Sequence, residues 1–180
     1  MPSRKERIQL ERRLQQKSGL QLNKRIYSVY DCSVYSIKGQ SDKLLKLVCL
    51  PIEETNLRDR LAVLRYIIKR NNPGIVKVFQ LRSFTIRGGN LKGRYYFYTM
   101  EKLRPLSIKR KNIIIDHLAE MVETGIPTKV KIPNKLLKLV QQVKSIRYPY
   151  WDMHSGNIME DKLGRAKFID LEGFLPEGFY

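Results

Sequence analysis

The chain is poor in cysteine and has no long run of apolar residues. Its two cysteines, Cys32 and Cys49, lie far apart and lack the CxxC spacing of a metal-binding pair, so we expect reduced thiols. No stretch has the length and lack of charge that a membrane span needs, and the N-terminal residues lack the apolar core of a secretory signal. These absences predict a cytoplasmic protein without a membrane span.

Acidic residues are also scarce. The 180 residues include 35 Lys and Arg but only 17 Asp and Glu, a formal net charge of +18 at pH 7. Such a charge predicts attraction to polyanions such as nucleic acid, anionic lipid, an acidic protein substrate or nucleotide phosphates, and it does not decide between them. Residues 152–180 are the exception, because they hold more acids than bases. A local acidic segment in a basic protein suits a site for a cation and a phosphate.

Hydrophobic periodicity predicts strands and a helix in the first half of the chain. Residues 1–25 are charge-dense with a weak apolar stripe, which favours a solvated basic arm over an exposed helix. Residues 26–50 have the pattern of two or three antiparallel strands joined by a hairpin turn. Residues 51–70 carry a helical apolar stripe, which ends at Asn-Asn-Pro-Gly, and strands follow at 75–79 and 94–100.

The second half is predicted to be mainly helical. One helix is expected over residues 113–124 and another from Pro133 to near Arg147. Short apolar runs at 157–159 and 167–169 bracket a turn-like insert and predict a final hairpin. The fold class is therefore α+β.

Three polar residues meet at one end of that predicted hairpin. Asp152 and Asn157 are five residues apart, and Asp170 lies thirteen beyond Asn157 on the other arm. Two carboxylates and an amide oxygen form a site for hard cations, and Mg²⁺ bound to nucleotide phosphates is the commonest use of such a site. A carboxylate that is not a metal ligand can accept a hydroxyl proton.

The same residues lie in two motifs. Residues 152–159, Asp-Met-His-Ser-Gly-Asn-Ile-Met, resemble the Asp-Leu-His-Pro-Gly-Asn-hydrophobic block of protein-kinase-like phosphotransferases, especially the aminoglycoside phosphotransferase and small atypical kinase branches. Residues 169–173, Ile-Asp-Leu-Glu-Gly, are similar to the Ile-Asp-Phe-Glu-Gly of that branch. The resemblance implies an ATP- and Mg²⁺-dependent kinase with Asp152 as catalytic base and Asn157 and Asp170 as metal ligands.

The resemblance also implies an organisation in lobes. Residues 26–103 would form an antiparallel N-lobe sheet with one helix and a hinge, and residues 104–180 a truncated, mainly helical C-lobe. Lys46, in Leu-Leu-Lys-Leu, matches the strand lysine that contacts ATP phosphates. Two alternatives stay open, since Lys46 can instead be an outward residue of a half-buried strand, and Lys43 competes for the role.

Residues 98–103, Tyr-Thr-Met-Glu-Lys-Leu, resemble the segment that runs from a strand into the hinge and binds adenine. By this resemblance Met100 is the gate residue of the ATP pocket. Glu101 and Leu103 would offer main-chain hydrogen bonds. A strand that simply runs into a loop is the alternative interpretation.

Two family features of the N-lobe are altered. Residues 29–35 contain no glycine where a Gly-rich phosphate loop is expected, so backbone amides approach ATP less freely. The position expected for the helix glutamate that pairs with the lysine holds Val63. Asp59, one turn earlier, is the candidate lysine partner.

The catalytic loop departs from the family pattern as well. Tyr150 replaces the usual histidine and is followed by Trp151, and both aromatics are expected to pack beneath the loop. His154 matches a family histidine, for which we expect a hydrogen-bonded structural role.

The end of the chain leads to two hypotheses. Soon after Gly173 the sequence stops, without an activation segment or the helical remainder of a C-lobe. We therefore expect either a minimal active kinase with an unspecified acceptor or a catalytically weak or dead pseudokinase. The pseudokinase would be a basic adaptor for nucleic acid or for a larger assembly, whose partner would complete the truncated lobe.

Overall fold

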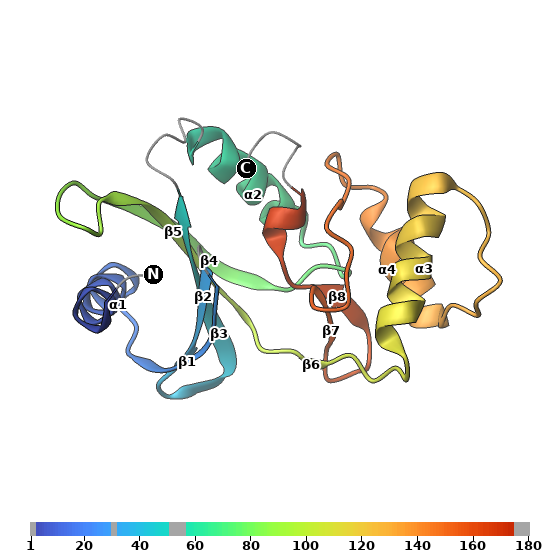
Figure 1. The fold of residues 1–180 in the computed structure, drawn as a ribbon, viewed down its shortest axis with the longest axis horizontal. Helices are drawn as coiled ribbons and strands as arrows, with labels where there is room; N and C mark the ends of the chain where they lie inside the picture. The colour runs from blue at the N-terminus through green and yellow to red at the C-terminus, as the bar shows by residue number, and fades with distance from the viewer. Residues whose placement is uncertain (1–2, 30–31, 51–56, 175–180) are drawn as a thin grey trace. The chain divides into compact units, whose positions relative to one another are not determined.

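A computed structural model describes residues 3–29, 32–50 and 57–174 of the chain. The fold is mixed, with four α-helices and a five-stranded antiparallel sheet among the described residues, so the α+β class is confirmed (Figure 1). The chain divides into two compact units. The first contains residues 1–58 and 78–102, and the second contains residues 59–77 and 103–180.

The first unit is built on the five-stranded sheet. Its strand order is β1-β2-β3-β5-β4, and neighbouring strands are antiparallel. The predicted hairpin turn lies between β2 and β3, where Gly39 has a positive φ of 74° that favours glycine. The strands are β1 (Leu22–Ser28), β2 (Cys32–Ile37), β3 (Gln40–Leu50), β4 (Val78–Ile86) and β5 (Gly93–Glu101).

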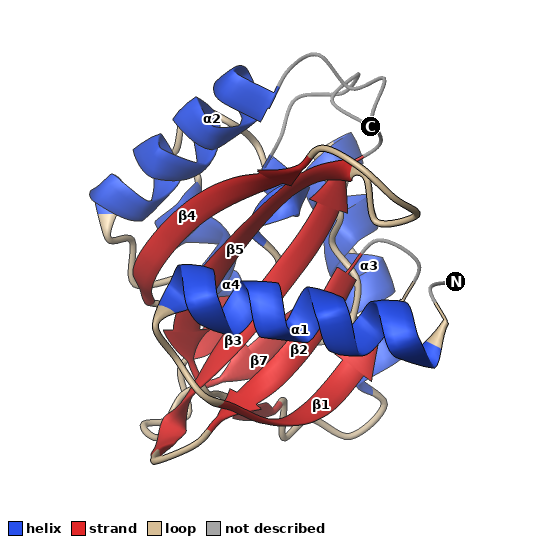
Figure 2. Ribbon diagram, turned by 90° about the vertical axis from the view of Figure 1, so that its left-hand side faces the viewer, coloured by secondary structure: helices blue, strands red, loops and turns tan. Residues whose placement is uncertain are grey.

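Helix α1 (Arg4–Ser18) lies across one face of this sheet (Figure 2). It begins with a capping box, in which the Ser3 amide donates to Glu6 Oε2 at 2.7 Å and the Glu6 amide donates to Ser3 Oγ at 3.3 Å. Leu14 is fully buried in the apolar core of the sheet. Residues 4–18 therefore form the helix alternative and not the favoured solvated arm, because burial of Leu14 fixes this helix to the sheet.

The second unit contains the other helices and a three-stranded sheet of order β6-β7-β8. None of the helices in the described ranges has the length and apolar character that a membrane crossing needs. The elements are α2 (Leu57–Arg70, whose first two residues belong to the first unit), β6 (Arg104–Pro105), α3 (Lys111–Thr124), α4 (Asn134–Val143), β7 (Ile158–Glu160), β8 (Ala166–Phe168) and the 3-10 helix η1 (Leu171–Phe174).

Two boundaries in this half differ from the prediction. Helix α4 ends at Val143, earlier than the expected end near Arg147, and a turn follows in which the Ile146 amide donates to the Val143 carbonyl. The strand expected at 75–79 is divided. Ile75 pairs in parallel with Phe168 of β8, whereas β4 begins only at Val78.

Candidate functional site

The hairpin of β7 and β8 brings the predicted site residues together. Ile158 pairs with Phe168 and Glu160 with Ala166, so the predicted hairpin is confirmed. One further bond extends the ladder past the strands, because the Ile169 amide donates to the Asn157 carbonyl at 3.0 Å. Asn157 therefore lies opposite Ile169 and next to the Asp170 segment, at what we call the open end of the hairpin.

Asn157 also binds the predicted catalytic base. Its Nδ2 atom donates to Asp152 Oδ2 at 2.7 Å and to the Asp152 carbonyl at 3.2 Å, and the Asn157 side chain is buried. Because the amide group is planar, its oxygen points to the side opposite these bonds. The Asp152 atom that accepts the hydrogen bond from Asn157 Nδ2 is Oδ2, and the same atom is the one nearest to His154 Nε2.

His154 has a hydrogen-bonded role within the loop, as expected. Its Nδ1 atom accepts a hydrogen bond from the Gly156 amide at 3.1 Å, so in the neutral ring the proton is on Nε2. Nε2 lies 3.7 Å from Asp152 Oδ2, beyond the length of a good hydrogen bond. The Asn157 amide donates to the His154 carbonyl at 3.0 Å and closes the turn.

Asp170 is oriented by the 3-10 helix that follows it. Its Oδ1 atom accepts a hydrogen bond from the Glu172 amide at 3.1 Å. The Trp151 amide donates to the Gly173 carbonyl at 3.0 Å, which connects η1 to the loop of Asp152. Asp152, Asn157 and Asp170 are thus linked through two backbone contacts, one at Asn157 and one at Trp151.

An aromatic cluster supports this loop from the inside. The Tyr150 ring stacks on Phe168 with centroids 3.9 Å apart and meets Phe174 edge-on at 4.7 Å. Tyr150 therefore packs as expected, but the same expectation for Trp151 is wrong, since Trp151 is 52% exposed.

The open end has suitable donors for Mg²⁺. An amide oxygen from Asn157 and a carboxylate from Asp170 are hard oxygen ligands, and Mg²⁺ commonly takes one or two protein oxygens together with phosphate oxygens and water. Within the described ranges, no group of three or more His, Cys, Asp or Glu could hold a metal. Asn157 and Asp170 could supply two oxygen donors to such an ion, with phosphate oxygens and water at its other positions.

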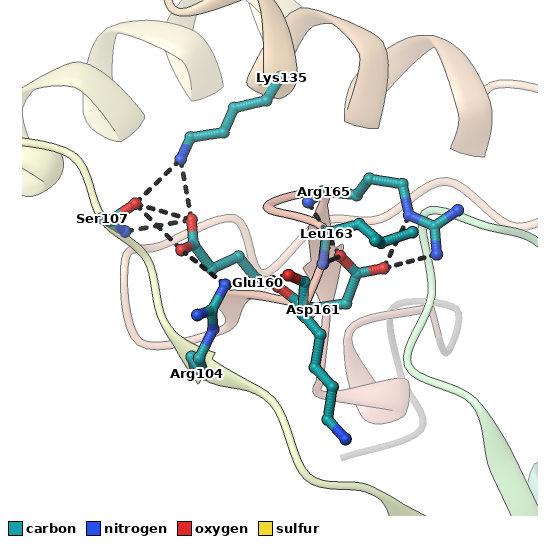
Figure 3. A network of polar contacts seen from close by, with 8 residues as sticks. Arg104, Ser107, Lys135, Glu160, Asp161, Leu163 and Arg165 are labelled. Carbon is teal, nitrogen blue, oxygen red and sulfur yellow. Dashed lines mark hydrogen bonds and ion pairs between the residues drawn. The ribbon is translucent and has the colours of Figure 1, made fainter.

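The other end of the hairpin holds two acids that sequence reasoning missed (Figure 3). Glu160 is 5% exposed, and its Oε2 atom lies 2.8 Å from Lys135 Nζ. Ser107 Oγ donates to Glu160 at 3.0 Å, and Arg104 approaches it at 3.8 Å. The hydrogen bond from Lys135, together with those from Ser107, holds the pKa of the Glu160 carboxyl below its usual range.

Asp161 closes the turn of the hairpin. Its Oδ2 atom accepts from Arg165 Nε at 2.7 Å, and its Oδ1 atom accepts from the Leu163 and Arg165 amides. Burial acts to raise the pKa of this carboxyl, but the hydrogen bonds from Arg165 and Leu163 outweigh burial and lower it. We call this part of the hairpin, with Glu160 and Asp161, the turn end.

The predicted ATP-phosphate lysine lies in the first unit. Lys46 is 7% exposed on β3, opposite Tyr98 of β5, and its Nζ atom lies 5.7 Å from the centroid of the Tyr98 ring. The alternative of an outward Lys46 is thus wrong, because the side chain is buried. Lys43, the competing lysine, instead has its Nζ atom 4.7 Å from the centroid of the Phe79 ring.

The predicted hinge residues follow along β5. Met100 is buried and lies two positions beyond Tyr98, so both project from the same face of the sheet. Glu101 is opposite Lys43 in the register and ends the strand. Leu103 is a buried residue of the second unit. Residues 98–103 therefore run from a strand into a loop, a pattern that the hinge interpretation and its alternative share.

Asp59, the candidate lysine partner, is exposed in the first turn of α2. It makes no ion pair with any residue in the described ranges, and its pairing with Lys46 stays a prediction. Val63, where the family pattern places the acid, is buried. The buried polar side chain near the start of this helix is the basic Arg60.

The segment without glycine between the first two strands is described only in part. The Val29 amide donates to the Cys32 carbonyl at 2.9 Å, while residues 30–31 lie outside the described ranges.

No family model matches the chain, and no curated protein matches it.

Proposed function

We propose that the chain is a minimal protein-kinase-like phosphotransferase that uses ATP and Mg²⁺. The hydrogen bond between Asn157 and Asp152, made next to the Asp170 segment at the open end of the hairpin, carries the proposal. A phosphoryl-transfer site needs a base and metal ligands close together, and the backbone bonds of Ile169 to Asn157 and of Trp151 to Gly173 hold the segments of these three residues side by side.

Asp152 is assigned as the catalytic base. Its Oδ2 atom is bound by the Asn157 amide, which leaves Oδ1 to accept the proton of an acceptor hydroxyl as that hydroxyl attacks the phosphoryl group. The side chain is 35% exposed, so an acceptor can reach it. A positioned base of this kind contributes roughly 10²–10⁴-fold to the rate.

Asn157 and Asp170 are assigned as ligands of Mg²⁺. When bound, the ion would neutralise charge on the transferred phosphoryl group. The chain contributes by fixing both donors before the ion arrives. The bonds of Asn157 Nδ2 to Asp152 and of Asp170 Oδ1 to the Glu172 amide supply that orientation.

Lys46, Met100, Glu101 and Leu103 are assigned to ATP. A lysine ammonium on a buried strand is a point charge suited to the phosphates, and its burial strengthens that attraction. Met100 would face the adenine, which would bond to the main chain of Glu101 and Leu103. Because residues 29–35 contain no glycine, we assign phosphate binding to Lys46 and the metal in place of a Gly-rich loop.

Turnover of γ-labelled ATP with Mg²⁺ tests the proposal. The wild type is expected to transfer or release the labelled phosphate, whereas Asp152→Ala and Asp170→Ala lose this activity. Asp170→Ala is also expected to lose metal-dependent nucleotide affinity. Asp116→Ala, which removes an exposed acid of α3, is the matched control and should behave as the wild type. Equal, negligible turnover in all four proteins would contradict an enzyme.

The net charge of +18 favours a second candidate, a catalytically dead pseudokinase that is a basic adaptor in a larger assembly. This candidate predicts nucleotide binding without turnover. Turnover that depends on Asp152 would exclude it.

A further inference from the structure

Two tyrosines and two arginines form a continuous row of ring contacts in the second unit. The Tyr66 ring of α2 meets the Tyr148 ring edge-on with centroids 5.7 Å apart. The Arg70 guanidinium lies 5.1 Å from the Tyr66 centroid, and the Arg147 guanidinium lies 5.7 Å from the Tyr148 centroid. We call these four residues the Arg–Tyr stack. The residues come from distant parts of the sequence, so folding creates the arrangement.

A hydrogen bond brings these parts of the chain together. Asn72, just after α2, donates from Nδ2 to the Gln142 carbonyl near the end of α4 at 2.6 Å. The ends of α2 and α4 are therefore adjacent, and the basic residues at both ends share one region. Lys69 and Lys144 are exposed there in addition to the two arginines.

This region has no acidic residue in its own sequence. No Asp or Glu occurs between Asp59 and Glu101, or between Glu123 and Asp152. The cations of the Arg–Tyr stack therefore have no acidic sequence neighbours to neutralise them. Lys69, Arg70, Lys144 and Arg147 concentrate positive charge at this surface, which suits an extended polyanion.

The geometry of the Arg–Tyr stack suits phosphate groups. Both arginines are exposed at the surface, while both tyrosines are half-buried. A guanidinium that lies on an aromatic ring loses side-chain freedom before it binds, and its outward N–H groups match a phosphate in bidentate fashion. Two such groups, with two lysines beside them, suit the regularly spaced phosphates of a nucleic-acid backbone.

We propose that the Arg–Tyr stack, with Lys69 and Lys144, is a nucleic-acid-binding surface that recognises the phosphate backbone without sequence preference. Tyr148 precedes Asp152 by four residues, so the surface is continuous in sequence with the loop of the proposed catalytic base. The binding does not depend on phosphoryl transfer.

Fluorescence anisotropy of labelled oligouridylate and oligothymidylate, titrated at several salt concentrations, tests this surface. Arg70→Gln with Arg147→Gln is expected to weaken binding, by roughly fivefold per arginine at 0.1 M salt. The log–log salt slope should become shallower by about 1.4, from two lost phosphate contacts on a single strand. Similar losses on both probes indicate backbone recognition, and a loss on the RNA probe alone would contradict it.

The matched control is Arg12→Gln with Arg13→Gln, which removes the same charge from exposed positions of α1. This double variant should bind nearly as the wild type does. If the two double variants bind equally, net charge alone explains the affinity and the proposed surface is wrong. Thermal unfolding of each variant confirms that the exposed substitutions leave the fold intact.

A second pair of variants tests the role of the rings. Arg70→Lys with Arg147→Lys keeps both charges but loses the planar group that lies on tyrosine. We expect an unchanged salt slope and an affinity between those of the wild type and the glutamine variant. Wild-type affinity in the lysine variant would overturn the proposed role of the stack.

Competition with polyglutamate separates nucleic acid from an acidic polypeptide. At equal charge, polyglutamate should displace the oligonucleotide much less effectively than unlabelled oligouridylate does. Equal displacement would overturn the proposal in favour of an acidic protein partner. These titrations need neither ATP nor Mg²⁺, so their failure and the failure of the proposed phosphotransfer are distinguishable.

Discussion

The two ends of the β7–β8 hairpin both carry acids, but these acids have different partners. At the turn end, Glu160 and Asp161 are buried and bind the cations Lys135 and Arg165. At the open end, Asp152 is partly exposed, and its short hydrogen bond comes from the neutral amide of Asn157. At the turn end, each carboxylate pairs with a cation of the protein. At the open end, the short hydrogen bond to the Asp152 carboxylate comes from a neutral group.

This difference separates a structural role from a chemical one. A buried acid that is already paired with a cation gains little by binding a ligand. Removal of either partner leaves the other charge buried and unpaired, which destabilises the fold. An accessible acid that is oriented by a neutral donor can still bind a proton or a cation. In a protein of net charge +18, such an oriented and accessible acid is the notable feature of the open end.

The largest loss of stability is expected from Gly173→Ala. A Cβ atom at this position would lie 2.5 Å from Tyr150 Cε2, and Tyr150 is held in place by its stacking on Phe168 and its edge-on contact with Phe174. We expect a loss of about 2 to 3 kcal/mol in the free energy of unfolding, measured by urea denaturation. Gly88→Ala, which meets nothing within 4 Å, is the control. Equal stability of both variants would show that the aromatic cluster is loosely packed.

A smaller loss is expected from Glu160→Gln at the turn end. Glutamine can still accept a hydrogen bond from Ser107, but it no longer pairs with Lys135. We expect a loss of about 1 to 2 kcal/mol in the free energy of unfolding. Glu123→Gln, at an exposed position of α3, should change stability by less than about 0.5 kcal/mol. If the two variants are equally stable, the Glu160 network contributes nothing.

Acid pH should weaken the turn end through the same carboxyls. The pKa values of Glu160 and Asp161 are lowered in the folded protein, so their contribution is complete above the unfolded pKa, at roughly 4. It is lost as pH falls through the lower folded pKa values. Urea unfolding of the wild type between neutral pH and pH values below the carboxyl range should reveal this loss. Glu160→Gln should lose less over the same interval, and parallel curves would contradict the assignment.

The smallest effect on stability is expected from Asp152→Asn at the open end. Asparagine keeps an oxygen that can accept the bond from Asn157 Nδ2, and no buried ion pair is broken. The free energy of unfolding should change by less than about 0.5 kcal/mol. A loss as large as that of Glu160→Gln would place Asp152 among the structural acids.

Local patterns in the sequence predicted most of the secondary structure. They also predicted that Asp152, Asn157 and Asp170 lie near one another at the open end. The hairpin, the strand of Lys46 and the strand that ends at Glu101 all follow from short apolar or aromatic runs. Asp152, Asn157 and Asp170 could be grouped in advance because one hairpin contains or borders all three.

The remaining features depend on contacts between distant residues. Glu160 binds Lys135 and Ser107, 25 and 53 residues away, so local reasoning saw only a turn-like insert. The Arg–Tyr stack likewise joins α2 to the segment after α4. Residues 4–18 looked like a solvated arm because few of them are apolar, yet the burial of Leu14 is enough to place α1 on the sheet.

The turnover of γ-labelled ATP by Asp152→Asn is the sharpest test of a catalytic role for the open end, because this variant is expected to remain as stable as the wild type. We expect a loss of roughly 10²-fold or more in phosphate transfer or release. Glu160→Gln, measured at a temperature where it is fully folded, should retain most of its activity. Wild-type turnover in Asp152→Asn would contradict the assignment of the open end as the catalytic site.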